Sequence, residues 1–434
     1  MAGQLILGLS ILVGLHELGH LLAAKVFGMR VEQYFIGFPP KVFSIKRGET
    51  EYGLGAIPLG GFVKISGMID ESLDTAHTDT EPKPYEFRSK PAWQRLIVML
   101  GGIIVNVIVG ILIFVIIAYK NGNMYLAAKD AKYGIVAYDL AQSIGLKTGD
   151  KIVKVNGKPV VDFYRDVLNM DLFLNNNSSY TVERNGKVED IYIPNNFMDQ
   201  LADKKKGERF IEPIEPFKVG KLAAGEPAAK AGLKSGDMII SANGKPIQFY
   251  HEFTDLVKPL KDKPLALGIN RNGQMLTLNM RTTDKGTIGF YPDFLLPRTT
   301  QEYTFGEALS VGTAEAFQIV FNNIKGFGKI FRGEVSASKA LSGPIGIAQN
   351  LFGGIWDWEH FWQITGILSM ALAFMNALPI PALDGGHATI LGYEIISGRK
   401  PSDRFLEGAQ RVGMVILLGL MAFAIFNDVF KAVF

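Results

Sequence analysis

The hydrophobic pattern of this 434-residue chain separates long apolar runs from a polar middle. The first run, Gly3 to Phe27, is long enough at about 1.5 Å per residue to cross a hydrocarbon core roughly 30 Å thick. Similar runs occur at Leu96 to Tyr119, Phe361 to Ile380 and Val412 to Val429. The pattern therefore predicts four transmembrane helices.

A different pattern follows the first run. Residues 52–65 read YGLGAIPLGGFVKI, in which Gly and Pro alternate with β-formers, and this favours short strands or a hairpin over a helix. Non-helical backbone is tolerated at membrane depth where protein or a watery cavity satisfies it. The segment could thus be a surface hairpin or a loop that dips toward a buried site, and both interpretations stay open.

The polar middle of the chain contains an internal repeat. Residues 145–160 read GLKTGDKIVKVNGKPV and residues 232–247 read GLKSGDMIISANGKPI, which implies two copies of one module. In each copy an apolar strand ends at an Asn-Gly pair, Asn156-Gly157 and Asn243-Gly244, which predicts a tight hairpin. Farther on, residues 305–331 have helical spacing and predict an amphipathic helix against a membrane surface or another domain.

Together these patterns predict a polytopic α-helical membrane protein with four transmembrane helices, a membrane-associated β-hairpin or loop and two inserted α+β modules. The expected segments are a first span at 1–28, a segment at 29–94 with the β-loop at 52–65, a second span at 95–120, modules at 122–208 and 209–295, an amphipathic connection at 300–360, a third span at 361–387 and a fourth at 410–431.

The charges of the chain predict its orientation in the membrane and argue against nucleic acid as a partner. The 45 basic and 42 acidic residues leave a net charge of +3 without a dense basic cluster, so nucleic acid is not an expected partner. The two short loops between spans are basic, which by the positive-inside rule makes them cytoplasmic and puts both termini and the modules on the other side. Their cations are Arg30, Lys41, Lys46, Arg47, Lys64, Arg88 and Lys90 in the first and Arg399, Lys400, Arg404 and Arg411 in the second.

This orientation brings two polar sets to one depth. The first and third spans run in the same direction, and their polar residues, His16 to His20 and Asn376 to Asp384, come late in each. Ionisable groups at membrane depth are unfavourable and usually functional, so two such sets at one depth suggest a single site.

The sequence HELGH at 16–20 is a metal motif. On a helix His16 and His20 face the same way and can bind one zinc ion, with Glu17 beside them to take a proton from water. Zinc would supply a Lewis acid that acidifies the water and polarises a peptide carbonyl. The pattern therefore predicts peptide hydrolysis at a zinc site, although the same ligands would also hold iron or cobalt.

A catalytic zinc site needs a third protein ligand, and the chain contains no Cys. Asp384 in PIPALDGGH is the best candidate, against the alternative that it caps a helix or sits in a turn. His387 is a weaker competitor. Asn106 could join two helices, orient the site or contact the substrate or an oxyanion. Asn376 could hold the substrate backbone or stabilise an oxyanion rather than pack between helices.

These pieces together resemble the site-2 protease family of intramembrane metalloproteases, in its bacterial RseP-like branch with two PDZ domains. The matching pieces run along the chain: HELGH at 16–20, IPLGGFVKI at 57–65, Asn106 after GGIIV, two PDZ-like modules, LSGPIGIA at 341–348, NALPIPALDGG at 376–386 and RVGMVILLGLMAFAIFND at 411–428. The second module also has the GEPAAKAGL lead-in of PDZ domains, where the first has YDLAQSIGL.

The resemblance implies cleavage of single-span membrane proteins in or near their transmembrane helix in the bacterial inner membrane, with the modules in the periplasm. The substrate would be an anti-sigma factor trimmed first by another protease. The IPLGGFVKI loop would add a strand to the unwound substrate through Gly60, Gly61, Phe62 and Val63. Two alternatives stay open: clearance of remnant signal peptides, and a membrane PDZ scaffold with an inactive zinc site.

Overall fold

The computed structural model describes residues 2–68, 81–202, 209–340, 342–352 and 357–433. Leu341, the first residue of LSGPIGIA, and parts of the predicted segments 29–94, 122–208 and 300–360 lie outside them. The chain forms two compact units, one of residues up to Gly122 and from Glu302 onward, the other of Asn123–Gln301. The second unit is thus inserted into the first.

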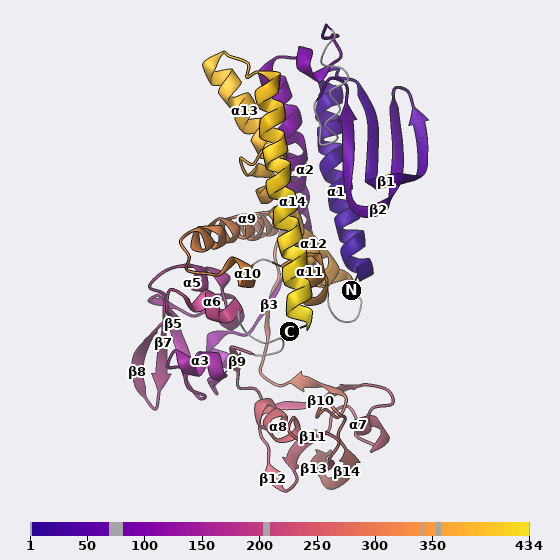
Figure 1. The fold of residues 1–434 in the computed structure, drawn as a ribbon. Coiled ribbons are helices and arrows are strands. Elements are labelled where there is room, and N and C mark those ends of the chain that lie inside the picture. Colours follow the sequence, from indigo (N-terminus) through magenta and orange to yellow (C-terminus); the bar gives the residue numbers. More distant parts are fainter. Residues whose placement is uncertain (1, 69–80, 203–208, 341, 353–356, 434) are drawn as a thin grey trace. The chain divides into compact units, whose positions relative to one another are not determined.

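The first unit is mainly helical (Figure 1). Its helices are α1 (Ala2–Val26), α2 (Ala92–Asn121), α9 (Phe305–Phe331), α10 (Ala337–Ala340), α11 (Pro344–Asn350), α12 (Trp358–Ala377), α13 (Asp384–Ser397) and α14 (Asp403–Val433), with a 3₁₀ turn at Phe87–Ser89. In α1, α2 and α14 the long apolar stretches favour a helix, because a helix satisfies its own backbone hydrogen bonds in apolar surroundings.

Three helices in the described part of the chain are long and apolar enough to cross a membrane: residues Gly3–Val26, Ala92–Asn121 and Arg404–Lys431. They contain the first, second and fourth predicted spans. The third predicted span falls on α12, a 20-residue helix that ends at Ala377, ahead of Pro379, and is not one of these three. The four-span count stays a prediction.

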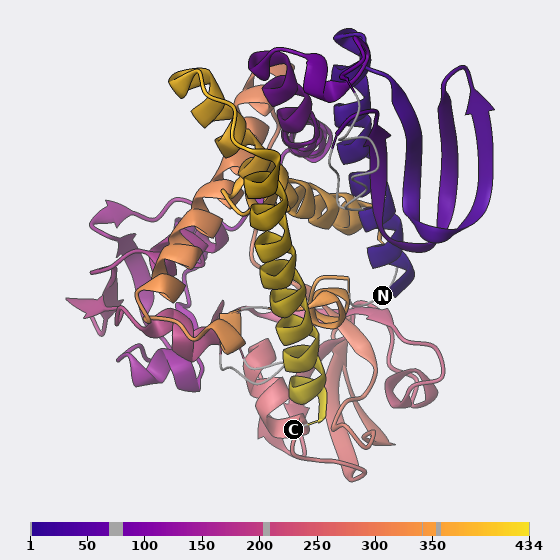
Figure 2. The ribbon, with the colours of Figure 1, turned by 45° about the horizontal axis from the view of Figure 1, so that its top comes forward.

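A sheet runs alongside α1 (Figures 1 and 2). It consists of β1 (Val31–Arg47) and β2 (Thr50–Ile65), and the prediction of strands at 52–65 is confirmed. Both strands bend, so residues 31–36 pair with 61–65 on one side and with 51–54 on the other, while 43–47 pair with 50–54. The stretch 61–65 is therefore an edge of this sheet.

The amphipathic segment at 305–331 forms α9 over the predicted range. Its first turn is closed by a capping box, in which Thr304 and Glu307 exchange hydrogen bonds between side chain and backbone. Its small residues face α2: a Cβ added to Gly312 would come within 2.5 Å of the Val115 backbone. The helix packs on α2 and α12, and Ala316 is buried with Phe114 and Met370.

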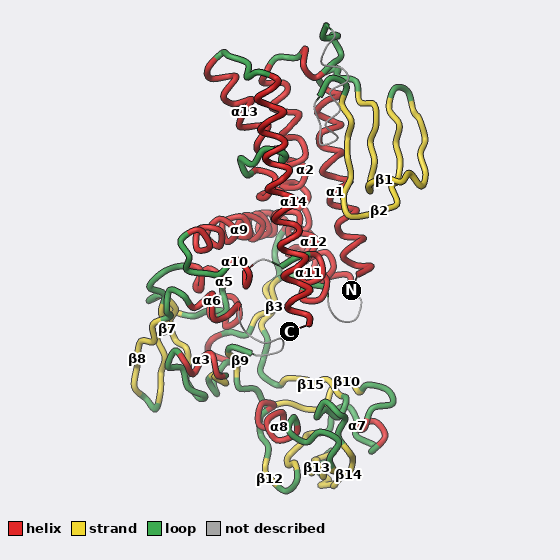
Figure 3. The backbone as a smooth tube through the Cα atoms, in the orientation of Figure 1, coloured by secondary structure: helices red, strands yellow, loops and turns green. Residues whose placement is uncertain are grey.

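The second unit alternates short strands and helices (Figure 3). Its strands are β3 (Asn123–Tyr125), β4 (Ile135–Ala137), β5 (Lys151–Val155), β6 (Lys158–Pro159), β7 (Ser179–Arg184), β8 (Lys187–Tyr192), β9 (Ile211–Pro213), β10 (Phe217–Leu222), β11 (Met238–Ala242), β12 (Lys245–Pro246), β13 (Pro264–Arg271), β14 (Gln274–Arg281), β15 (Phe290–Phe294) and β16 (Thr299–Gln301). Its helices are α3 (Asp139–Ser143), α4 (Phe163–Val167), α5 (Met170–Leu174), α6 (Phe197–Ala202), α7 (Pro227–Lys230) and α8 (Tyr250–Val257), with a 3₁₀ turn at Ala128–Asp130. The unit begins and ends in one ladder, because β3 pairs with β16.

The internal repeat gives two sheets of the same topology, β6-β5-β7-β8 and β12-β11-β13-β14. The Asn-Gly pairs make the predicted hairpin turns, since Asn156, Gly157, Asn243 and Gly244 all have positive φ. Each sheet lies over its own hydrophobic core. The first core also holds Phe210 and Ile211, which come after the predicted module boundary at 208/209.

Candidate metal centre

The site begins with a close crossing of α1 and α2. A Cβ on Gly19 would lie 2.2 Å from the Gly101 carbonyl oxygen, so the two backbones are in direct contact. Small residues permit this kind of approach between helices in membranes. Gly102 is equally constrained, because its Cβ would lie 2.5 Å from both His16 Cε1 and His20 Nε2. The missing side chains leave room for the two imidazoles against α2.

His16 and His20 lie one turn apart on α1 and are both buried. On its Nδ1 side, each ring contacts α2: His20 Nδ1 is 2.8 Å from the Val98 carbonyl oxygen, and His16 Nδ1 is 3.1 Å from the Asn106 amide. Because a carbonyl can only accept, His20 carries its proton on Nδ1. Its Nε2 lone pair is thereby left free to bind a metal.

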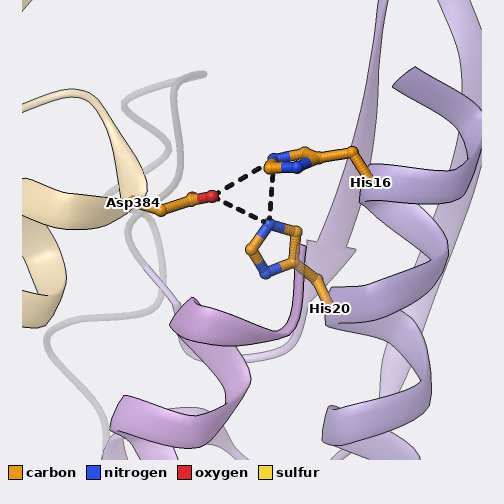
Figure 4. A group of neighbouring side chains, drawn as sticks. All are labelled: His16, His20 and Asp384. Atoms are coloured by element: carbon orange, nitrogen blue, oxygen red, sulfur yellow. Dashed lines mark hydrogen bonds and ion pairs between the residues drawn. The ribbon is translucent and has the colours of Figure 1, made fainter. Parts of the chain in front are cut away.

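Asp384 reaches the imidazoles from the other end of the chain. After α12 ends at Ala377, a turn through Pro379 and Pro381 leads to α13, whose first residue is Asp384. Its Oδ2 lies 3.1 Å from His16 Nε2 and 3.3 Å from His20 Nε2 (Figure 4). Leu383 occupies the N-cap position of α13, so Asp384 is not the cap of this helix, and its carboxylate faces the histidines.

These three residues fit a divalent metal. The ligand atoms of His16, His20 and Asp384 lie within 4.8 Å of one another, and no other such group occurs among the described residues. The two Nε2 atoms are 3.3 Å apart, and Asp384 Oδ2 is buried without a conventional hydrogen-bond donor. Three converging acceptors repel one another unless a cation binds them, and two imidazoles with one carboxylate are a zinc donor set.

Glu17 lies beside this group and under the edge of the β sheet. The Val63 backbone N–H approaches its carboxylate. The approach is close, because a Cβ on Gly61 would lie 3.4 Å from Glu17 Cγ and 2.7 Å from the Phe35 carbonyl oxygen. The edge strand therefore holds the carboxylate next to the metal ligands.

A cavity of about 510 Å³ opens on the three ligands and Glu17. This volume suits an extended peptide segment or a small ligand. Its other lining residues are Gln33, Phe38, Pro39, Gly61, Phe62, Val63, Lys64, Ile65, Met68, Met99, Asn376, Ala382, Leu383, His387, Gln410 and Met414. The edge strand and the ligands thus share one cavity.

The remaining predicted residues take different places. Gly61, Phe62 and Val63 line the cavity. Gly60 lies against the Phe38 ring, because a Cβ added to Gly60 would come within 2.2 Å of a ring carbon. The Asn376 amide nitrogen is 3.2 Å from His16 Nε2, which places it at the metal-binding side of that ring.

Asn106, on the other hand, lies on the Nδ1 side of His16. It is fully buried and is not among the described residues that line the cavity. This position does not favour the substrate or oxyanion contact predicted for it. It favours the alternative, in which Asn106 orients the site.

The sequence did not reveal the Val98 carbonyl or the contribution of α14. A backbone acceptor has no sequence signal. Gln410 and Met414 of α14 line the cavity, and their only signal is that they lie in or next to the matched segment 411–428.

Comparison with known proteins gives the chain a family. The profile of peptidase family M50 matches residues 4–420. The chain belongs to peptidase family M50. It is 30% identical over 98% of its length to a Neisseria meningitidis protein whose name describes it as a zinc metalloprotease, covering 97% of that protein.

Two further relatives carry a more specific name. The chain is 29% identical to the regulator of sigma-E protease RseP of Salmonella typhimurium and to that of Escherichia coli, over 98% of this chain and 97% of each relative. This M50 chain is a membrane protein and a zinc metalloprotease, a hydrolase of peptide bonds. The predicted family, enzyme class and cofactor are confirmed.

Proposed function

We propose that this M50 peptidase is an intramembrane endopeptidase that cleaves single-span membrane proteins in or near their transmembrane segment. The observation that carries the proposal is the position of the metal group. His16 and His20 lie in the second half of a helix apolar enough to span a membrane, and Asp384 meets them there. A soluble protease with a membrane anchor would carry its metal ligands in the soluble domain, because ionisable groups inside a transmembrane helix are unfavourable.

The residues divide the chemistry between them. His16, His20 and Asp384 would hold zinc, which would act as a Lewis acid on water and on the scissile carbonyl. Glu17, which lies beside the Val63 N–H, would accept the proton of the attacking water and pass it to the leaving amine. Asn376 lies close enough to the ligands to donate to the substrate carbonyl.

The edge strand 61–65 receives the substrate. A helix hides its peptide bonds in its own hydrogen bonds, so a transmembrane substrate must unwind before it is cut. Residues 61–65 pair with β1 on one side only in the described sheet, and Gly61, Phe62 and Val63 line the cavity beside Glu17. An extended substrate added to this edge would present its backbone to the metal group.

For the physiological substrate we propose a membrane-bound anti-sigma factor. The support is the name of the relatives, regulator of sigma-E protease, together with the match over nearly the whole chain. The cut would follow trimming by another protease. The basic short loops support placement in the inner membrane, in contact with its lipid, with both termini and the modules in the periplasm.

The two modules of the second unit would act as PDZ domains that select trimmed substrates. A cleft of about 1110 Å³ in this unit is lined by α8 and by residues 286–291, and it is wide enough for an extended peptide. The modules would either exclude a bulky extracytoplasmic domain or engage the newly made chain end. Clearance of remnant signal peptides would use the same chemistry, and the complete ligand set argues against an inactive scaffold.

The test uses the purified full-length protein with a panel of single-span substrates, intact or trimmed, and a remnant signal peptide. Glu17→Gln should keep zinc and lower the cleavage rate by about 10²- to 10⁴-fold, because only the proton acceptor is lost. Trimmed anti-sigma substrates should be cut faster than intact ones. Full activity of Glu17→Gln would refute the mechanism, and preference for the signal peptide would favour the alternative role.

A further inference from the structure

The inference concerns Asn106 on α2, which touches a metal ligand without facing the cavity. Its side chain is completely buried, and its amide nitrogen is placed 3.1 Å from His16 Nδ1. Its amide oxygen Oδ1 is buried as well and has no hydrogen-bond partner among the described residues. A buried unpaired amide oxygen next to an imidazole nitrogen requires an explanation.

The proton count at His16 supplies that explanation. To bind a metal through Nε2, which faces Asp384, the neutral ring must carry its proton on Nδ1. Nδ1–H and the Asn106 NH₂ group are then both donors and cannot bond to each other. The orientation of a side-chain amide is assigned from its hydrogen bonds. Turned by 180°, the amide offers Oδ1 to Nδ1–H, which also satisfies the unpaired oxygen.

We propose that Asn106 is a positioning residue whose Oδ1 accepts the Nδ1–H of His16 and so holds the Nε2 lone pair toward the metal. Asn106 does for His16 what the Val98 carbonyl does for His20 at 2.8 Å. The two acceptors lie eight residues apart on α2, on the face that packs against the HELGH turn. The inference rests on the proposed role of His16 as a ligand.

Helix packing alone does not account for this side chain. The contact between α2 and α12 at this level is a hydrogen bond of 2.7 Å from the Ser369 hydroxyl to the backbone carbonyl of Asn106. Any residue at position 106 supplies that carbonyl. The amide itself is therefore available for His16, and the two roles of the residue can be separated by mutation.

The experiment measures zinc affinity of the full-length protein in detergent by competition with a chelator. Asn106→Leu removes the acceptor at similar volume and should weaken zinc binding by about 10- to 100-fold. Asn106→Asp keeps an acceptor and should bind zinc like the wild type. Ser369→Ala, which removes only the hydrogen bond to the Asn106 carbonyl, should also leave the affinity unchanged.

Wild-type affinity in Asn106→Leu, or an equal loss in Asn106→Asp, would overturn the inference. His16→Gln separates it from the proposed function: if His16→Gln binds zinc normally, the ligand assignment itself fails. A second measurement covers the case in which Asn106→Leu does not fold. Nitrogen NMR of histidine-labelled wild type, assigned by difference from His16→Gln, should show a protonated Nδ1 at His16, and an unprotonated Nδ1 would refute the proposal.

Discussion

Two buried acids of the second unit, Asp150 and Asp237, and Asp384 of the first unit differ in what faces their carboxylates. In the second unit, Asp150 and Asp237 are each 1% exposed, and the carboxylate of each accepts three hydrogen bonds. Asp237 accepts from Arg271 Nε at 2.7 Å, from Arg271 Nη2 at 2.6 Å and from the Lys234 N–H at 2.8 Å. Asp150 accepts from Arg184 and the Lys147 N–H in the same pattern, so the repeat reproduces one ionic contact twice.

In the first unit, Asp384 has no such partner. Its Oδ2 faces two imidazole nitrogens, and the proton of at least one of those rings is committed elsewhere. A buried carboxylate whose oxygens accept hydrogen bonds from its own fold is satisfied there, whereas one that faces other acceptors is arranged for a cation. The difference separates a structural acid from a functional one without reference to the motif in which each lies.

The largest effect should come from replacing Asp384 by its amide, with the same change at Asp237 as the control. Asp384→Asn should weaken zinc binding by at least about 100-fold and remove peptidase activity, because it removes one of the three metal ligands. Asp237→Asn should leave zinc affinity unchanged. Zinc content measured by elemental analysis after dialysis checks both, and stoichiometric zinc in Asp384→Asn would remove this residue from the ligand set.

The next effect concerns the space around the ligands. Gly102→Ala puts a Cβ 2.5 Å from both imidazoles and should lower the cleavage rate by about 100-fold, because the rings must move. Gly110→Ala on the same helix is the control. Its Cβ would meet Met370, with Sδ at 2.5 Å, and none of the three atoms nearest to it belongs to a ligand. Equal rates for the two variants would show that the ligands tolerate displacement.

A smaller effect is expected in the second module. Asp237→Asn removes the charge from a buried acceptor and should lower the free energy of unfolding of that module by about 1 to 3 kcal/mol. Hydrogen exchange of β11 and β13 in the full-length protein reads this out. Zinc binding and cleavage of trimmed substrates should stay near wild type. Unchanged exchange would mean that the contact with Arg271 contributes nothing.

The smallest effect is a dependence on pH. Burial alone would raise the pKa of Asp237, but the hydrogen bonds from Arg271 and the Lys234 N–H outweigh it and hold the pKa below its ordinary value. Since the folded pKa is the lower one, the stabilisation is complete above the unfolded pKa of about 4 and is lost as the pH falls through the folded pKa. Pepsin cleavage within the module should therefore rise below about pH 4, and Asp237→Asn should flatten this rise.

Much of the site could be predicted from the sequence because its signals are local. The four-residue spacing of His16 and His20 places both on one face of a helix, and the apolar run around them predicts that this helix lies in the membrane. The Asn-Gly pairs likewise set their turns locally, through positive φ at Asn156 and Asn243. Asp384 needed a longer argument, from span direction and polar depth, and the structure brings it within 3.1 Å of His16.

Other features could not be predicted, because they depend on partners distant in sequence. The strand β1 was missed, since its residues alternate only weakly and its pairing with β2 uses both of its edges. Phe210 and Ile211 were assigned by composition to the second module, yet β9 pairs with β4 and completes the first core. Asn106 had even alternatives until its distance to His16 was known.

The sequence by itself determined which residues could bind a metal, that they lie inside an apolar helix, and that the polar middle is a repeat. These follow from spacing, hydropathy and similarity along the chain. Only the tertiary structure decided that residues 368 positions apart, His16 and Asp384, meet. It also decided that Val63 lies beside Glu17 and that α2 places the Val98 carbonyl at His20 and the Asn106 amide at His16, because such contacts form between helices and strands whose approach depends on the packing of several glycines at once.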